Sequence, residues 1–175
     1  MPVAFSERRI LMKYSIAVIA ALLFFPGGAS FARPKDSAAT CKDLNRKIAA
    51  LADEYKELRE RRRRLPQGTF DNDLSGHGGR LHQVLSALGV ELGHPPYTKK
   101  IVTACLEEPD AIRRQEQMRN FLGIYHRELR KAGRRIVDKS EREYLIYFWR
   151  GWHDFVFFIV ERGVIIDHGW WFAYE

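Results

Sequence analysis

Two adjacent pairs of histidine and aspartate, His153-Asp154 and Asp167-His168, are the residues of this 175-residue chain whose types and spacing could do chemistry. An imidazole beside a carboxylate can bind a metal ion or serve as an acid and a base. His77 is a third candidate, because it lies in the glycine-rich stretch 75–79 and glycines let a backbone approach a ligand closely. Together these residues support one hypothesis, a histidine-dependent enzyme.

The expected strand pairing separates the two pairs. If the last hairpin turns at residues 161–163, His153 faces about Trp171 and His168 faces about Val156, three positions apart along the ladder. At about 3.4 Å per residue this is on the order of 10 Å, whereas ligands of one metal ion lie roughly 2 Å from it. We therefore expect local hydrogen bonds within each pair, no metal site and no cofactor.

Motifs for other kinds of catalysis do not occur in the sequence. It contains no Gly-x-Ser-x-Gly, and the neighbours of Cys41 and Cys105 do not suggest a nucleophile. The glycine-rich stretch lacks the Lys and the Ser or Thr of a phosphate-binding loop. The sequence therefore predicts a protein without catalytic residues, and the histidine-dependent enzyme is the alternative.

Aromatic residues are concentrated in the last 32 residues, 144–175, which contain all four tryptophans and twelve of the chain's aromatic residues. Within them, the aromatic and β-branched runs 144–149, 155–160 and 164–174 are typical of β-strands. Arg150-Gly151 and Arg162-Gly163 separate the runs as turns. The sequence predicts a three-stranded antiparallel meander.

Both faces of this meander are apolar, because successive side chains point to opposite faces and neither set is polar. We expect helices on one face, and a further helix, a partner or an apolar ligand on the other. The second face is the best functional candidate in the sequence. The candidate binding residues are Tyr147, Trp149, Trp152, Trp170, Trp171 and His77.

Helical periodicity is confined to the chain before Gly133. Apolar residues at spacings of three and four predict an amphipathic helix over 40–64, capped by Thr40, which packs on its own domain or on one partner helix and is short for a coiled coil. A glycine-rich loop over 65–79 follows, and then an α+β domain over 80–175. This domain has short helices over 80–88 and after Thr98, and a helix over about 111–132.

The segment 111–142 is the most basic part of the chain, with ten Lys or Arg against four acids. Four acids among these cations dilute the single-sign surface that nucleic-acid binding requires, so nucleic acid is not an expected partner. Anionic lipid or an acidic protein surface is the expected partner of this helical insertion.

The first 32 residues have the pattern of an export signal. Basic Arg8, Arg9 and Lys13 precede the apolar run 14–25 and a small-residue site that ends at Ala32. This run is shorter than the about 20 residues that span a bilayer, so we expect cleavage after Ala32 and a periplasmic or secreted protein. A retained membrane helix is the alternative, and translation starts at Met1 or Met12.

Cys41 and Cys105 are the only cysteines. An oxidising exported compartment favours a structural disulfide between them, and two separate buried thiols are the alternative.

The stretch 98–110, TKKIVTACLEEPD, followed by a meander with Trp149, Gly163 and Trp170, resembles the SmpA/OmlA (BamE-like) outer-membrane module over about 81–175. The resemblance implies a fold of two helices and three strands that binds proteins in the envelope and has no catalytic activity. Glu107 stands where that family usually has glycine, 111–142 is an insertion, and the family's lipid-anchor cysteine is absent.

Three functions are compatible with these patterns. The leading one is an exported envelope module that binds a protein partner through its aromatic sheet. The others are an inhibitor or immunity protein against an exported hydrolase, with the His77 loop as its contact, and the histidine-dependent enzyme.

Overall fold

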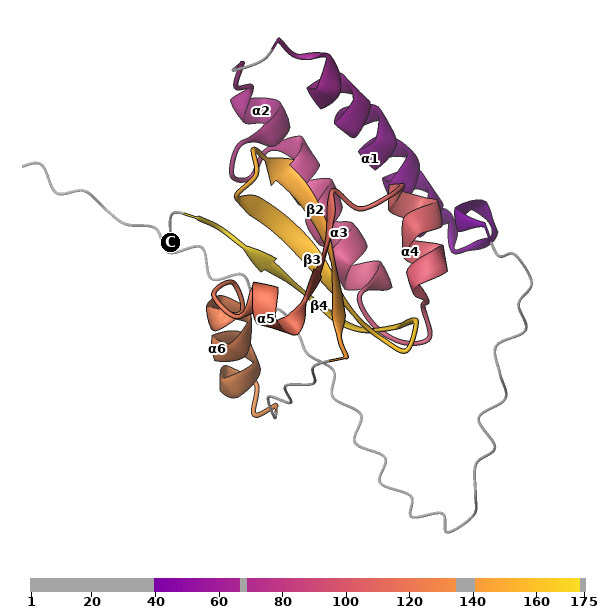
Figure 1. Cartoon of the computed structure of the whole chain (residues 1–175). Helices are drawn as coiled ribbons and strands as arrows, with labels where there is room; N and C mark the ends of the chain where they lie inside the picture. The colour runs from indigo at the N-terminus through magenta and orange to yellow at the C-terminus, as the bar shows by residue number, and fades with distance from the viewer. Residues whose placement is uncertain (1–39, 67–68, 135–140, 174–175) are drawn as a thin grey trace, which may run out of the picture. The chain divides into compact units, whose positions relative to one another are not determined.

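The computed structural model describes residues 40–66, 69–134 and 141–173 (Figure 1). The predicted export signal over 1–32 lies outside these residues. No helix in the described ranges is long and apolar enough to cross a membrane. In chain order the elements are η1 (Cys41–Asp43), α1 (Arg46–Arg64), α2 (Asn72–Ser75), α3 (Arg80–Leu92), α4 (Lys99–Leu106), β1 (Ala111–Arg114), α5 (Gln115–Met118), α6 (Gly123–Lys131), β2 (Glu143–Arg150), β3 (Asp154–Glu161) and β4 (Val164–Trp171).

The predicted α+β class and the antiparallel meander of β2, β3 and β4 are confirmed. Glu161 pairs with Val164, so Arg162 and Gly163 form a two-residue turn. Both have positive φ, 54° and 79°, the conformation whose twist matches that of two antiparallel strands. A fourth strand, β1, pairs with β2 and gives the sheet order β1-β2-β3-β4.

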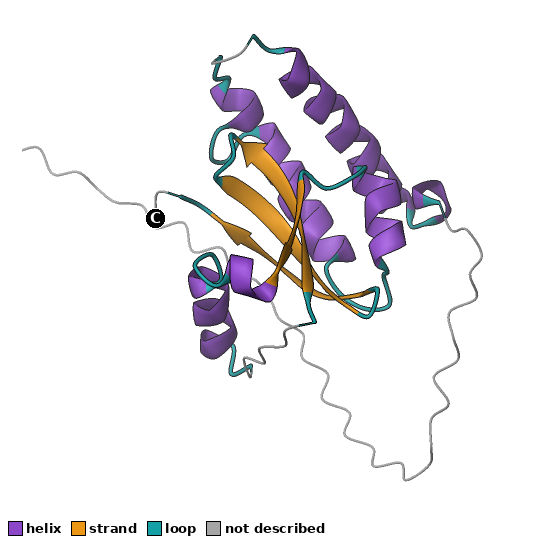
Figure 2. Cartoon of the chain, viewed as in Figure 1, coloured by secondary structure: helices purple, strands orange, loops and turns teal. Residues whose placement is uncertain are grey.

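One face of the sheet is covered by α1, α3 and α4, and the other by α5 and α6 (Figure 2). The first core contains Tyr55 of α1 and Leu85 of α3, packed with Tyr147 and Trp149 of β2. The amphipathic helix therefore packs on its own domain. It begins after Asn45, whose side chain accepts from Lys47 N–H, while Thr40 caps the short η1 instead.

The second face is covered by the chain's own insertion. Met118, Phe121, Leu122 and Tyr125 pack on the aromatic residues of β2 and β3. The prediction of one helix over 111–132 is wrong, because residues 111–114 pair with β2 and only 123–131 form the main helix. The apolar residues of this segment are spaced as in one helix, although they belong to a short helix, a turn and a second helix.

Two further boundaries differ from those predicted. The glycine-rich loop contains the short α2, whose N-cap Asp71 accepts from Leu74 N–H. Helix α3 continues through Gly89 to Leu92. Cys41 and Cys105 lie at disulfide distance, and the pair joins η1 to α4 across a sequence separation of 64 residues.

Candidate functional site

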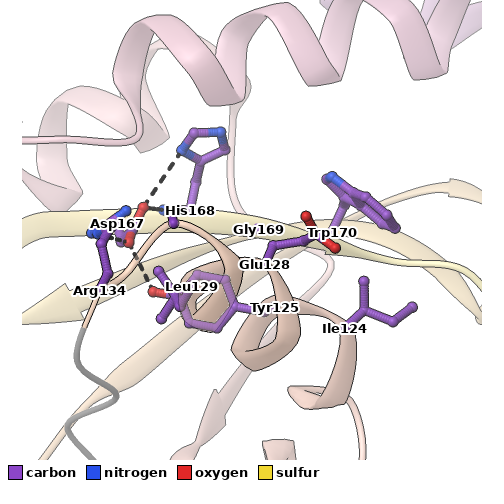
Figure 3. Close-up of a pocket in the computed structure, with 10 residues that line it drawn as sticks. Ile124, Tyr125, Glu128, Leu129, Arg134, Asp167, His168, Gly169 and Trp170 are labelled. Carbon is purple, nitrogen blue, oxygen red and sulfur yellow. Dashed lines mark hydrogen bonds and ion pairs between the residues drawn. The ribbon is translucent and has the colours of Figure 1, made fainter. Parts of the chain in front are cut away.

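A pocket of about 340 Å³ lies between α6 and the outer edge of β4 (Figure 3). Strand β4 is the last strand of the sheet, and residues 97–99 cover only the beginning of its edge. There Lys99 N–H donates to Gly163 C=O at 2.9 Å, and Ile165 N–H donates to Tyr97 C=O at 2.8 Å. The pocket lies beyond this bridge and is lined by Ile124, Tyr125, Glu128, Leu129, Ala132, Arg134, Asp167, His168, Gly169 and Trp170.

Asp167 holds α6 and the residues after it against β4. One carboxylate oxygen, Oδ2, accepts from Tyr125 Oη at 2.8 Å and pairs with Arg134 Nη2 at 2.7 Å. The other, Oδ1, accepts from the backbone N–H of His168 at 2.9 Å. Burial, with the charge of Asp167 beside it, raises the pKa of Tyr125, so the phenol stays a hydrogen-bond donor.

The outer edge of β4 has hydrogen-bonding groups next to the pocket. The N–H of His168 donates to the Asp167 side chain, so it points away from β3. The backbone groups of successive residues point alternately to the two edges of an antiparallel strand. The backbone N–H and C=O of Trp170, two residues after His168, therefore point to the same outer edge. In the described part of the chain no strand pairs with this edge beyond Ile165.

The imidazole of His168 lies on the opposite side of β4 from Tyr125, against the end of α3 (Figure 3). A Cβ placed on Gly89 would approach the ring to 2.9 Å, so only glycine fits there without displacing it. Nδ1 is 4.0 Å from Asp167 Oδ1, beyond a hydrogen bond. Burial lowers the pKa of His168, and the charge of Asp167 opposes this in part.

Acidification is expected to destabilise the fold through His168. The unfolded imidazole binds protons below about pH 6.5, whereas the folded one, with its lowered pKa, binds them only at lower pH. The free energy of unfolding therefore falls as the pH falls from about 6.5 to the folded pKa, and it is unaffected by this group above that window. Urea unfolding from about pH 7.5 to about pH 5 measures the effect.

The variant His168→Gln should flatten this pH dependence, and the exposed His94→Gln should change it much less, because the charge of His94 is one of the smaller causes of the lowered pKa of His168. An equally steep dependence in His168→Gln would show that the ring does not contribute.

A second histidine, His82 of α3, was not singled out by the sequence, yet it joins the predicted His77 in an aromatic cluster. The His82 ring stacks on Trp149 with centroids 4.6 Å apart, and His77 lies 5.1 Å from His82 and 4.8 Å from Phe172. Nδ1 of His82 accepts from Gly78 N–H at 3.0 Å. Burial and the neighbouring His77 lower the pKa of His82. The stacking on Trp149 and the hydrogen bond from Gly78 pack the glycine-rich loop on the sheet.

The other predicted pair, His153 and Asp154, forms the expected local contact. Asp154 is buried and accepts from His153 Nδ1 and from Ala173 N–H, both at 2.9 Å, and pairs with Arg150 Nε at 2.7 Å. A bulge at residues 159–160 places His168 opposite Phe158, five residues along the chain from His153. The predicted register, with Val156 opposite His168, is wrong for two reasons: the turn has two residues instead of the three assumed, and the bulge shifts the pairing by one more.

The two histidine and aspartate pairs therefore belong to different places, as the sequence predicted. Within the described ranges, no group of three or more His, Cys, Asp or Glu side chains is arranged to hold a metal ion.

The six predicted binding residues have very different accessibility. Tyr147 and Trp149 are buried in the core, and Tyr147 donates its hydroxyl to Glu107 C=O at 3.1 Å. Trp170 and Trp171 are half-buried on opposite faces of β4. His77 is exposed, and Trp152 is the most exposed large apolar residue, at 80%. Of the six, only Trp170 lines the pocket.

No protein-family model, curated protein or solved structure matches this chain.

Proposed function

We propose that this protein is an exported, non-catalytic module that binds a protein partner in the groove between α6 and β4. The occupant that fits best is an extended segment of that partner, added beside β4 as a further strand. The observation that carries the proposal is the pocket along an edge of β4 that residues 97–99 leave open.

The groove has the two features that strand addition uses. The backbone of Trp170 supplies main-chain hydrogen-bonding groups at the edge, which give affinity for any extended chain. Ile124 and Leu129 of α6 supply apolar side chains, and a pocket beside the edge selects the side chain of the partner that enters it.

The polar groups of the groove are suited to binding rather than to catalysis. Asp167 is occupied by Tyr125, Arg134 and a backbone N–H, so it is held as an anchor for α6. The imidazole of His168 is on the other side of the strand. A catalytic base must lie within hydrogen-bond reach of its substrate and be free to take its proton. The other carboxylate that lines the pocket, Glu128, is paired with Lys131 at 2.7 Å.

Export is proposed from the first 32 residues and is supported by the disulfide, since such bonds persist in oxidising compartments. The resemblance to the SmpA/OmlA module supports the same role, that of an envelope binding protein.

Filling the pocket is expected to abolish partner retention without unfolding the protein. Ala132 lines the pocket, is exposed and ends α6, so Ala132→Tyr should place a ring in the groove at little cost in stability. Crosslinking in the envelope of the native host, followed by mass spectrometry, should recover a partner with the wild type and lose at least about nine-tenths of it with Ala132→Tyr, as expected for a sterically blocked site.

The matched control is Val90→Tyr, which adds a tyrosine at an exposed position of α3. Equal recovery of the same partner by wild type and both variants would exclude the groove as the binding site. If the recovered partner is a hydrolase that this protein inactivates, the module is an inhibitor.

A further inference from the structure

The glycine-rich loop between α2 and α3, residues 76–79, is attached to the sheet through the imidazole of His82. Gly78 N–H donates to His82 Nδ1 at 3.0 Å, and the ring stacks on Trp149 of β2 with centroids 4.6 Å apart. Gln83 Nε2 also donates to Gly78 C=O at 2.6 Å, but this bond joins the loop only to its own helix, α3. His82 is therefore the side chain that connects Gly78 to the sheet.

His77 closes the same place from outside. It is exposed, and its ring centroid lies 5.1 Å from that of His82 and 4.8 Å from that of Phe172. Phe172 is 8% exposed. The closed loop thus places one imidazole against another and helps to cover an aromatic residue.

Glycines make the closed shape of the loop possible and entropically costly. A Cβ on Gly76 or Gly79 would lie 2.5 or 2.8 Å from the Asn72 carbonyl oxygen, and Gly78 has a positive φ of 77°. Glycines lose more conformational freedom on ordering than other residues, so opening of the loop regains much of it. A small number of contacts therefore decides whether the loop is closed.

The hydrogen bond from Gly78 requires a neutral His82. A backbone N–H can only donate, so Nδ1 is the acceptor and the proton of the neutral ring is on Nε2. A second proton, on Nδ1, removes the acceptor and directs a donor at Gly78 N–H. His82 also lies in the first turn of α3, where the helix dipole disfavours a positive charge. The indole of Trp149 favours a cation stacked on it, but it does not restore the lost bond. Arg80, in the same turn, is paired with Glu54 of α1.

Titratable groups on neighbouring elements act on the ring in opposite directions. Burial and the charge of His77 lower the pKa of His82, and the buried Asp154 of β3 opposes them in part. Asp154 already accepts from His153 Nδ1 and pairs with Arg150, which limits its attraction for a proton on His82.

We propose that protonation of His82 releases the loop 76–79 from the sheet, so that the loop is a latch that opens in acid. Above about pH 6.5 the ring is neutral and accepts from Gly78, and the loop is closed. Below that pH the open form binds the proton more readily, so the equilibrium constant for opening rises by up to about tenfold per pH unit until the closed form also binds it. Release takes the His77 ring away from Phe172 and makes Phe172 accessible.

An NMR titration of the processed protein from about pH 7.5 to about pH 5 tests the proposal. The His82 ring signals, the Gly78 amide signal and the proton contacts between the rings of His77 and Phe172 should change with one common midpoint, below about pH 6.5. Amide hydrogens of β2 and β3 should keep their slow exchange, because only the loop opens.

Two variants separate the latch from other effects of acid. His82→Asn keeps an acceptor without a titrating ring, since Oδ1 of asparagine and Nδ1 of histidine are both bonded to Cγ, so its loop should stay closed at pH 5. His77→Gln should keep the transition and move its midpoint to higher pH, because a like charge is removed.

Loop signals that do not change down to pH 5, a Gly78 midpoint that differs from that of the His82 ring, or a His82→Asn loop that opens in acid like the wild type would each overturn the proposal. If His82→Asn is open at every pH because the stack on Trp149 is lost, the shift in His77→Gln decides. An unchanged midpoint there would then overturn the proposal.

Discussion

Replacing Arg59 with alanine is expected to lower the free energy of unfolding by about 3–5 kcal/mol, the cost of leaving a buried charge without its partner. Arg59 of α1 is 5% exposed. Its Nη2 pairs with Asp110 Oδ1 at 2.6 Å, and its Nη1 donates to the carbonyls of Leu106 and Glu108 at 3.1 and 3.0 Å. Chemical denaturation of the purified wild type and variant measures the difference.

The effect on stability is large because Asp110 also connects the turn after α4 to strand β2. Its other oxygen accepts from Phe148 N–H at 2.8 Å, and its own N–H donates to Ile146 C=O at 2.9 Å. Arg59 therefore joins α1, the turn after α4 and strand β2. Loss of the arginine leaves the carboxylate of Asp110 and two carbonyls without their donors.

Two variants serve as controls for this prediction. Arg63→Ala, at a half-exposed position on the same helix, should change stability by less than about 1 kcal/mol. The double variant Arg59→Ala with Asp110→Asn removes the unpaired charge and should recover part of the loss. A decrease below about 1 kcal/mol in Arg59→Ala would show that water replaces the guanidinium.

The strands of the meander could be predicted because they are continuous runs of aromatic and β-branched residues. Gly151 and Gly163 mark the turns between these runs. The pairing of Cys41 with Cys105 was predictable as one of two alternatives, because an oxidising compartment was expected from the export pattern. The helix over 46–64 followed from its spacing, which places Ile48 and Tyr55 on one face.

Strand β1 could not be predicted, because its four residues, Ala-Ile-Arg-Arg, carry no strand pattern of their own. Pairing with β2 determines their conformation. The bulge at residues 159–160 is likewise a property of two strands together, and with the two-residue turn at Arg162-Gly163 it makes Phe158 rather than Val156 the partner of His168.

The roles of the arginines in α1 were also invisible in the sequence. A run of four at the end of a helix is typical of a solvated last turn, and three of them are well exposed. Arg62 instead donates to Phe148 C=O, and Arg59, one turn earlier, is buried. These positions differ in the groups that lie beside them, which are Asp110 and the turn after α4 for Arg59 and the C=O of Phe148 for Arg62. Tertiary packing determines those neighbours.

The candidate groove was partly predictable. Trp170 was among the predicted binding residues because aromatic residues concentrate in the last strand. The sequence also showed that something must cover the second apolar face, but could not tell a helix from a partner. Because α5 and α6 cover that face, the candidate groove lies instead between α6 and the edge of β4.

Removing the disulfide is expected to lower the free energy of unfolding by about 4 kcal/mol, the loop-entropy value for a closed loop of this length. The bond closes 64 residues that include α1, α2 and α3, so its loss frees a large part of the unfolded chain. The double variant Cys41→Ser with Cys105→Ser, compared with the wild type in denaturant, measures the effect. The wild type in excess reductant should match the double variant.

Removing the disulfide should also destabilise one end of α1 locally. The disulfide joins η1 to α4, while Ile48, Ala52 and Tyr55 hold the rest of α1 in the core. In the variant, amide hydrogens of residues 41–47 should therefore exchange faster than in the wild type, while those of β2 and β3 follow only the global change. Uniform acceleration across α1 and the sheet would show that this end of the helix is not a separate opening unit, and that the disulfide acts through the unfolded chain alone.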